Sequence, residues 1–380
     1  MNSVRIRSTI NLICMPTLLF TPCAVIAEGF AGQDWNPYND PVTGVVVQRL
    51  IVFAAEDEVV YYTHPMWTQE MRHIIFDSKR EGKGKALHTL RLSDKAVVQV
   101  APVSSGYGVL ARKSNRFYYL YDRDFYVRDV GEAFARTGAP KPVASLPENV
   151  KGLSGGMSLG AEEKSLYLGV TLEEENRWAL MALDLASGKW RTVTNLRFQI
   201  GHIQASPFET GRIMFCHETG GFATQRTWVI REGDFAPKPM FKAPHDYWVT
   251  HESWWAKDKI VFTVWPYDNA HKKIPHGILS AAAESDQATE HARFPAWHTH
   301  DSPNGQWIVG DDFDRNIWLV KVATNERRLL SQGHKSKEIN THPHASFTPD
   351  SKAVIFNSSR DGQANIFLIE LPDFSALAPL

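Results

Sequence analysis

The feature that most constrains the fold is a repeat of short apolar runs. Each run is bounded by Gly, Asp, Asn, Ser or Pro and is followed by a turn and a second run, the pattern of β-hairpins. The runs return at intervals of about 47 residues, which is the period of one four-stranded blade of a β-propeller. Clear examples are HIIFDS (73–78), SLYLGV (165–170), RIMFCH (212–217), KIVFTV (259–264), QWIVGD (306–311) and AVIFNS (353–358).

The length of the chain fixes how many such repeats it can hold. Of its 380 residues, roughly 350 remain after the N-terminal segment, which is enough for seven blades at this period. We therefore predict an all-β protein, a single seven-bladed β-propeller of four-stranded antiparallel blades over residues 28–380. The segments 43–51 and 187–195 are predicted outer strands, and the first would pair with the last blade to remove free sheet edges. Two packed β-sandwiches are the competing arrangement, and the regular spacing disfavours them.

The N-terminus has the organisation of a secretory signal. Arg5 and Arg7 form a basic start, residues 10–26 are apolar, and residues 25–27 form a small-residue cleavage site. A membrane anchor is the alternative, but this apolar run is short and is interrupted by two prolines. We predict a signal peptide at 1–27, a secreted or periplasmic location, and no membrane insertion of the mature chain.

Cysteine content and charge exclude several classes of protein. Cys14 and Cys23 would leave with the signal, unless Cys23 is lipidated, so Cys216 remains alone and no intramolecular disulfide is possible. Cys216 lies in an apolar run and is predicted to be a buried strand residue rather than a nucleophile. Lys plus Arg number 41 and Asp plus Glu number 42. This balance lacks the excess positive charge that is typical of nucleic-acid-binding proteins. We expect a monomer.

Histidines recur in one phase of the later repeats. With Ser206, Ser302 and Ser346 as anchors, one position holds a histidine in each repeat and the position two residues later is also polar. The first position is His202, His251, His298 and His342, and the second is Gln204, Ser253, His300 and His344. Residues i and i+2 of a strand point to the same side, and the innermost strands of a propeller surround its axis. These side chains are therefore predicted to meet in a central funnel, where imidazoles could hold a divalent transition metal.

Other polar and aromatic residues receive weaker predictions. Glu218 and Asp311 are candidate funnel carboxylates, and the tryptophans beside the histidines could stack on sugars or pack between blades. His217 stands between the phased histidines and the remaining ones as a site candidate, because it ends a strand in the repeat that carries His202. The remaining histidines are predicted to be surface or loop residues: His64, His73, His88, His245, His271, His276, His291 and His334.

Five segments resemble a known family. They are FCHE (215–218), QRTWVI (225–230), VTHE (249–252), VGD (309–311) and THPHASFTPDSKAVIF (341–356). In these segments the chain resembles the oligogalacturonate lyases, seven-bladed propeller enzymes of pectin degradation that are distantly similar to TolB-type propellers. The resemblance is best after residue 200, and the N-terminal blades match only generically.

The resemblance implies a manganese site. The family's metal-binding histidines match His298, His342 and His344, whereas the position of its fourth ligand, a Gln, holds Ile339 here. An isoleucine cannot coordinate, so Gln204, His300, Asn340 or water would have to complete the shell.

The resemblance also implies a reaction and its residues. The family's general base matches His251 and its substrate-binding arginine matches Arg226; we add His202, Gln204 and His217 as candidate substrate contacts. The implied activity is β-elimination of oligogalacturonate, a uronate oligosaccharide, to a 4,5-unsaturated product. A metal would act as Lewis acid on the carboxylate beside C5, a histidine can remove a proton near neutral pH, and a guanidinium can pair with a carboxylate.

Three alternatives stay open at this level. The chain could be a lyase for another uronate oligosaccharide, which the change at Ile339 permits. It could be a non-enzymatic TolB-like propeller that binds a partner through its funnel, although histidines in one phase count against this. A metal hydrolase ranks lower, because the histidine segments lack a carboxylate base in matching phase.

Overall fold

The computed structural model describes residues 36–51, 55–80, 84–102, 107–219, 223–244, 247–266, 277–335, 339 and 341–379. The predicted signal peptide (1–27) and the candidate ligand Asn340 lie outside these residues. The part of the chain from Asp34 onward forms one compact unit. None of the helices in the described residues has the length and apolar character needed to cross a membrane.

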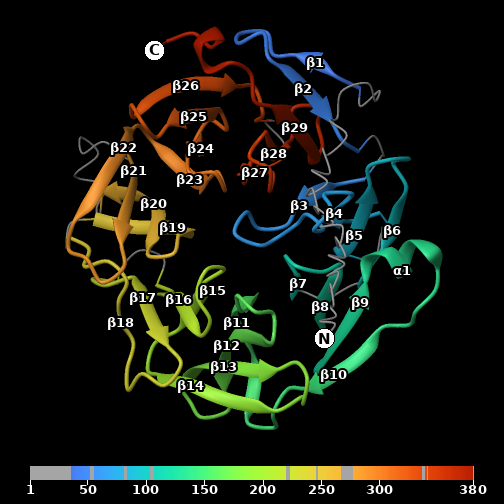
Figure 1. Ribbon diagram of the computed structural model, residues 1–380, viewed down its shortest axis with the longest axis vertical. Helices are drawn as coiled ribbons and strands as arrows, with labels where there is room; N and C mark the ends of the chain where they lie inside the picture. Colours follow the sequence, from blue (N-terminus) through green and yellow to red (C-terminus); the bar gives the residue numbers. More distant parts are fainter. Residues whose placement is uncertain are drawn as a thin grey trace, which may run out of the picture. The chain divides into compact units, whose positions relative to one another are not determined.

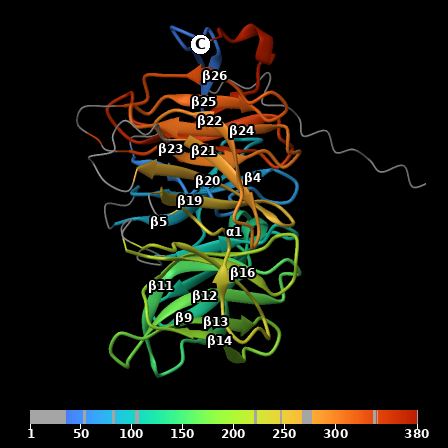
Figure 2. The same ribbon diagram turned by 90° about the vertical axis from the view of Figure 1, so that its left-hand side faces the viewer.

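Seven antiparallel sheets follow one another in a ring around a central axis (Figure 1). The predicted seven-bladed propeller is therefore confirmed. In the view turned by 90° (Figure 2), the strands of successive blades lie one above the other along the ring. In the described residues the only α-helix is the short α1 (Val130–Ala135), which joins two strands of the second blade and caps its first turn with Asp129.

The first four blades run in chain order from the axis outward. Blade one comprises β3 (Asp57–Val59), β4 (His73–Ser78), β5 (Ala86–Arg91) and β6 (Val97–Gln99). Blade two comprises β7 (Tyr107–Leu110), β8 (Arg116–Tyr121), β9 (Asp124–Asp129) and β10 (Lys141–Ser145). Blade three comprises β11 (Val150–Leu159), β12 (Ser165–Leu172), β13 (Trp178–Asp184) and β14 (Trp190–Leu196). Blade four comprises β15 (Ile200–Ala205), β16 (Arg212–His217), β17 (Thr227–Arg231) and β18 (Lys238–Pro239).

The last three blades carry all of the predicted phased histidines except His202 of blade four, and they close the ring. Blade five comprises β19 (Tyr247–Ala256), β20 (Lys259–Pro266), β21 (Gly277–Ala282) and β22 (Ala288–Arg293). Blade six comprises β23 (Ala296–Asp301), β24 (Trp307–Asp312), β25 (Ile317–Lys321) and β26 (Glu326–Ser331). Blade seven comprises β27 (Ser346–Phe347), β28 (Ala353–Ser358), β29 (Asn365–Glu370) and the N-terminal strands β2 (Val46–Arg49) and β1 (Tyr38–Asn39), followed by the 3-10 helix η2 (Phe374–Ala376).

The N-terminal strands seal the ring as predicted from residues 43–51. In β2, Gln48 pairs with Leu368 and Arg49 with Phe367 of β29. The other predicted outer strand, in residues 187–195, is β14, the last strand of blade three. Because the first and last parts of the chain share one sheet, opening the ring requires breaking this pairing.

Asp40 ties the same N-terminal segment to the neighbouring sixth blade. Its carboxylate accepts hydrogen bonds from Ser331 Oγ (2.7 Å) and from the backbone N–H of Gln332 (2.8 Å). Burial by itself raises the pKa of Asp40, but these bonds and those from the backbone N–H groups of Thr43 and Val42 outweigh it and lower the pKa below its usual value. The ionised carboxylate therefore favours the closed ring.

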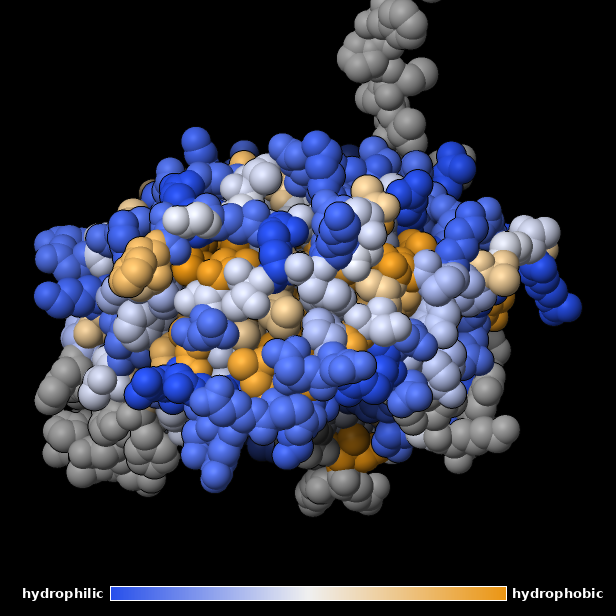
Figure 3. Space-filling view, turned by 90° about the horizontal axis from the view of Figure 1, so that it is seen from below, coloured by the Kyte–Doolittle hydropathy of each residue, from blue (hydrophilic) through white to orange (hydrophobic). Residues whose placement is uncertain are grey.

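The apolar runs that define the repeat become the middle strands of the blades. A blade is covered on both faces by its neighbours, so such strands read as continuous apolar runs rather than alternating ones. Residues Ala353–Ser358 of β28 are all buried, and Cys216 lies buried on β16 as predicted. Figure 3 shows the outer side of the ring, where hydrophilic residues dominate and apolar side chains show only in small areas between them.

The prediction that the remaining histidines are surface or loop residues is wrong for His88 and His291, which are buried on strands. His334 lies in a loop as predicted, but it is buried there. Hydroxyl and amide partners explain two of these: His291 bonds Ser280 (2.8 Å) and Asn325 (3.0 Å), and His334 lies between two serines. His245, His271 and His276 lie outside the described residues.

Candidate metal centre and channel

A shared hydrogen bond defines equivalent positions at the ends of the innermost strands. The backbone N–H of Ser206 donates to Arg212 O (2.8 Å), that of Ser302 to Trp307 O (2.9 Å), and that of Thr348 to Ala353 O (2.9 Å). Thr348, and not Ser346, therefore corresponds to the other two serines. The predicted register was wrong by two residues in the seventh blade, because matching serines were aligned without knowledge of the strand pairing.

Four residues before these anchors stands a ring of histidines. His202, His298 and His344 occupy this position in blades four, six and seven. In blade five the pairing of Trp254 with Ile260 matches that of Ala205 with Ile213, which places His251 in the same position.

Blade one adds a fifth histidine. There the N–H of Thr68 donates to His73 O, so His64 occupies the equivalent position. The structure thus moves His64 from the predicted surface into the channel. The spacing His-x-x-x-Ser/Thr, shared by residues 64–68 and 298–302, could have revealed it.

The strands are irregular where the histidines stand. Register shifts occur between Gly201 and Gln204, between Thr250 and Ser253, and between Ala296 and Thr299. His202, His251 and His344 have positive φ angles of 49°, 54° and 47°. A bulge of this kind re-aims a side chain and stores backbone strain of about 1–3 kcal/mol per residue, which proteins keep mostly at functional sites.

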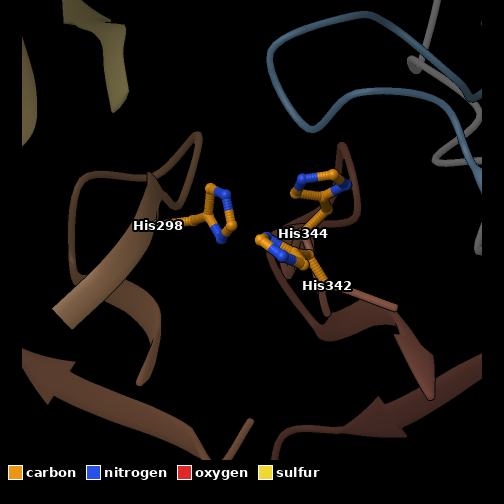
Figure 4. Close-up of side chains that lie close together, drawn as sticks. All are labelled: His298, His342 and His344. Carbon is orange, nitrogen blue, oxygen red and sulfur yellow. The ribbon is translucent and has the colours of Figure 1, made fainter. Parts of the chain in front are cut away.

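Three imidazoles lie close together and point toward one another (Figure 4). The rings belong to His298 of β23 and to His342 and His344, which precede β27, and one nitrogen of each lies within 4.8 Å of the other two. The ring centroids of His298 and His344 are 4.5 Å apart, and those of His298 and His342 are 5.4 Å apart. Burial lowers the pKa of all three, most strongly for His298 and His344, so the rings are held in the neutral form that binds metals.

Asp311 of β24 fixes the orientation of His298. Its Oδ1 accepts from the backbone N–H of His298 (2.7 Å), and both carboxylate oxygens lie 3.0 Å from Nδ1 of the ring. Nδ1 therefore carries the proton, and Nε2 is left as the ligand atom. The predicted funnel carboxylate is thus an outer partner of the metal centre, the arrangement that orients histidine ligands in metalloproteins.

The donor set fits a divalent transition metal. Three neutral imidazoles suit manganese or zinc chemistry and leave coordination positions for water or substrate. Ile339 provides no ligand through its side chain, and its carbonyl accepts a hydrogen bond from Ser359 Oγ (3.4 Å).

His251 stands next to the metal centre, with its ring centroid 4.3 Å from that of His298. Its Nδ1 lies 3.3 Å from Thr263 Oγ1, which itself donates to the carbonyls of Thr250 and Trp297 at 3.2 and 3.1 Å. Because the hydroxyl proton is used in that way, Thr263 accepts from Nδ1–H and His251 Nε2 is unprotonated. Burial and the neighbouring His298 lower the pKa of His251 well below its usual value, so it is neutral and able to accept a proton.

Arg226 lies between blades four and five and is almost fully buried. Its Nε lies 3.2 Å from Glu252 Oε1 and its Nη1 lies 3.8 Å from Glu218 Oε1. Burial alone lowers the pKa of Arg226, but the carboxylates outweigh it and raise the pKa above its usual value. His202 Nε2 lies 3.6 Å from Glu218 Oε2. The same oxygen accepts a hydrogen bond from the thiol of Cys216 at 3.4 Å. The structure therefore brings Arg226 and His202 together through Glu218.

Three predicted site residues do not reach the metal centre. His300 and Gln204 line a second chamber, beyond Tyr62, whose ring lies 5.6 Å from His298 and 6.4 Å from His300. Two residues along a strand amount to roughly 6–7 Å, enough to place them on the other side of this ring. His217 packs on Phe198 with the centroids 4.3 Å apart.

A cavity of about 400 Å³ adjoins the metal centre on the side of blades one to four. Tyr61, His64, His202, Glu218 and Asp77 line it, and the Tyr61 ring lies 5.1 Å from that of His344. Burial raises the pKa of Asp77 to about 6. Tyr61 and Asp77 were missed from the sequence, since nothing in their spacing links them to the histidine repeat.

Trp254 and Trp297 make packing contacts between strands. Trp254 is buried and its indole N–H donates to Gln204 O (3.0 Å). Trp297 packs on Phe313, Trp265 and His342, with the centroids of Trp297 and His342 4.9 Å apart. Trp297 therefore buttresses a predicted metal ligand.

Comparison with known proteins agrees with this geometry. No protein-family model matches the chain. The chain is 26% identical to an oligogalacturonate lyase of Dickeya dadantii and 25% identical to an oligogalacturonide lyase of Pectobacterium atrosepticum, each match covering 89% of this chain and 96% of the relative. Over most of its length the chain is therefore similar to proteins named oligogalacturonate lyases. A solved structure of an oligogalacturonate lyase in complex with manganese superposes with a TM-score of 0.78 at 20% identity, covering 90% of this chain and 96% of that one, which supports the family's propeller fold.

Proposed function

We propose that the protein is a metal-dependent lyase that cleaves oligogalacturonate by β-elimination. The observation that carries this proposal is the His251 ring beside the cluster of three histidines that could hold a metal. Tyr61, which lines the cavity of about 400 Å³, lies with its ring 5.1 Å from that of His344 in this cluster. Relatives named for this activity and the manganese complex of a structural neighbour support it.

His298, His342 and His344 would hold the metal, which we assign as manganese. When bound, the metal supplies a Lewis acid that stabilises negative charge on the substrate's C6 carboxylate. Asp311 keeps His298 in the ligating tautomer. His300 is not among the cluster of possible ligands in the described residues, so water is the proposed fourth ligand.

The proton transfer is assigned to His251. Its Nε2 takes the proton from C5, and the electron pair of that C–H bond forms the C4–C5 double bond. The C4–O4 bond breaks with its electron pair on O4, which takes a proton from water as the leaving sugar departs. Thr263 accepts from Nδ1–H throughout and so stabilises the imidazolium that forms. Such base catalysis contributes typically ~10²–10⁴-fold to the rate.

Arg226 is proposed to bind a uronate carboxylate or the charge that develops on it. Glu252 fixes the guanidinium at Nε, which leaves the Nη groups on the side of Glu218, a wall residue of the cavity. His202 shares that wall and is proposed as a contact to substrate hydroxyls. Gln204 and His217 are not proposed as contacts of the scissile sugar.

The test is a direct assay of elimination. The mature chain is incubated with digalacturonate, longer oligogalacturonates and other uronides, with Mn²⁺ or EDTA, and ultraviolet absorbance of the unsaturated product is followed. We expect Mn²⁺-dependent product and a loss of at least ~10²-fold in kcat for His251→Gln. His73→Gln, at the start of β4 in blade one, is the matched control and should keep full activity. Absence of product with every uronide would refute the lyase proposal and favour a binding propeller.

The sugar specificity is tested in the same experiment. Ile339 replaces the amide found in the family at this place, which favours including uronides other than galacturonate. Higher kcat/KM on another uronide would assign the chain to that substrate.

We also propose that the mature chain starts near residue 28, is secreted or periplasmic and is monomeric. The basic and apolar residues of the N-terminal segment support export. Intact-mass measurement of the exported protein and its elution in size-exclusion chromatography test these points.

A further inference from the structure

The channel has a second polar chamber beyond the histidine ring. Its volume is about 60 Å³, and its polar wall is formed by His64, Arg112, Gln204, Ser253 and His300. The Tyr62 ring lies 5.6 Å from the ring of His298 and 6.4 Å from that of His300. The chamber includes none of the three clustered histidines in its wall, although it shares Thr63, His64 and Ile203 with the cavity of about 400 Å³.

An aromatic pocket of about 360 Å³ adjoins this chamber and shares Arg112, His300 and Trp254 with it. Trp255 and the half-exposed Phe208 line its wall. These residues follow the ring histidines along the innermost strands, so the pocket lies toward the end of the channel opposite the one where the metal histidines stand.

Arg112 is the charged group of this chamber. Within the described ranges, the structure records neither a hydrogen bond nor an ion pair for its guanidinium. The carboxylate that acts on it electrostatically is Glu163, whose Oε1 accepts from the backbone N–H of Lys113 (2.7 Å). The Arg112 side chain is exposed, although desolvation by nearby protein atoms lowers its pKa to about 10. A guanidinium without a protein partner is stabilised by an anion, with carboxylate as its best-matched planar partner.

Ser253 provides an independent observation. The residue is only 4% exposed, and its Oγ has no hydrogen-bond partner among the described residues. Buried hydroxyls without a partner are rare in folded proteins and cost about 1–3 kcal/mol. Because Ser253 lines the chamber with Arg112, both offer donors to the same small space.

The sizes of the two spaces select the ligand. A chamber of about 60 Å³ accommodates a carboxylate or a few waters, but not a sugar ring. The adjoining pocket of about 360 Å³ has room for one ring, and its aromatic side chains suit the apolar face of a sugar.

We propose that this end of the channel binds a hexuronate, with its carboxylate at Arg112 and Ser253 and its ring in the aromatic pocket. The choice of a sugar acid among carboxylates rests on the proposed function. The site is an accessory binding site, separate from the residues assigned to elimination.

The test is binding of monomeric D-galacturonate to the mature chain in EDTA, followed by calorimetry and by tryptophan fluorescence. EDTA removes the metal-dependent mode, so the result does not depend on lyase activity. We expect saturable binding to the wild type, a loss of at least ~10-fold in affinity for R112Q, and a smaller loss for S253A. The matched control is R116Q, which removes an exposed guanidinium from the same blade and should bind as the wild type.

Two further ligands decide the chemistry. Galactose lacks the carboxylate and should bind at least ~10-fold more weakly, whereas inorganic phosphate should bind without changing tryptophan fluorescence. Wild-type affinity in R112Q, absence of binding, or equal affinity for galactose would overturn the proposal. Circular dichroism of each variant separates a lost site from a lost fold.

Discussion

Replacing Asp311 with Asn should weaken metal binding without unfolding the protein. The wild-type carboxylate makes three contacts with His298, one to the backbone N–H at 2.7 Å and two to Nδ1 at 3.0 Å. Asn keeps one acceptor oxygen, loses the charge, and presents an amide N–H that competes for the wrong tautomer. A hydrogen bond to a charged group contributes about 1.5–3 kcal/mol, which corresponds to a loss of roughly 10–100-fold in metal affinity.

The assay is a titration of the metal-free protein with Mn²⁺, in which free Mn²⁺ is measured by electron paramagnetic resonance. Asp312→Asn is the matched control, because this substitution removes the same charge from the next residue. Asp312 accepts hydrogen bonds from Asn316 and Trp318 and none from a histidine among the described residues. We expect its dissociation constant to stay within about twofold of the wild type. Equal constants for the two variants would refute the reasoning that Asp311 positions His298.

Replacing Asp40 with Asn should lower the unfolding free energy by about 2 kcal/mol in urea titrations at neutral pH. Because folding lowers the pKa of Asp40 below 3.8, this contribution is complete above that value and lost as the pH falls, so the variant should lose less stability than the wild type on acidification. Gly155→Ala should lower the melting temperature more than Gly44→Ala: both glycines have positive φ, but a Cβ at Gly155 would clash with the Gly201 backbone, whereas Gly44 has nothing within 4 Å. Mn²⁺ at about a hundred times its dissociation constant should add ~2.7 kcal/mol of stability, EDTA should remove it, and His342→Ala should not show it.

We expect metal binding and closure of the ring to be coupled, because both involve blade seven. His342 and His344 precede β27 of that blade, and β2 completes its outer side. A loss of pairing between β2 and β29 would loosen the sheet that carries two of the three ligands. Melting of Asp40→Asn with and without Mn²⁺ measures this coupling, and identical metal-induced shifts in both proteins would argue against it.

Much of the architecture was predictable because it is repeated. The period of the apolar runs gave the seven blades, and the apolar character of residues 43–51 gave the closing strand. The resemblance of short segments to a known family, and not the repeat itself, implied His298, His342 and His344 as a metal set. These features depend on short segments, and each segment contains a sequence pattern that can be recognised without knowing the tertiary structure.

The register of the seventh blade and the place of His64 depended on pairing between strands. Ser346 and Thr348 both follow a histidine at a plausible distance, and only the hydrogen bond from Thr348 to Ala353 selects between them. His64 lies far from the other histidines in sequence and stands outside the best-matching segments. A single residue of register decides which way a side chain faces, and bulges change the register locally.

The sequence alone determined the kind of protein: a closed all-β ring with histidines at its axis. Only the tertiary structure decided which groups surround each histidine. Asp311 bonds His298, Thr263 sets the tautomer of His251, and Glu252 holds Arg226 across the boundary between two blades. Strand formation follows from local patterns of side chains, whereas protonation and orientation depend on partners that reach the axis from other strands and blades.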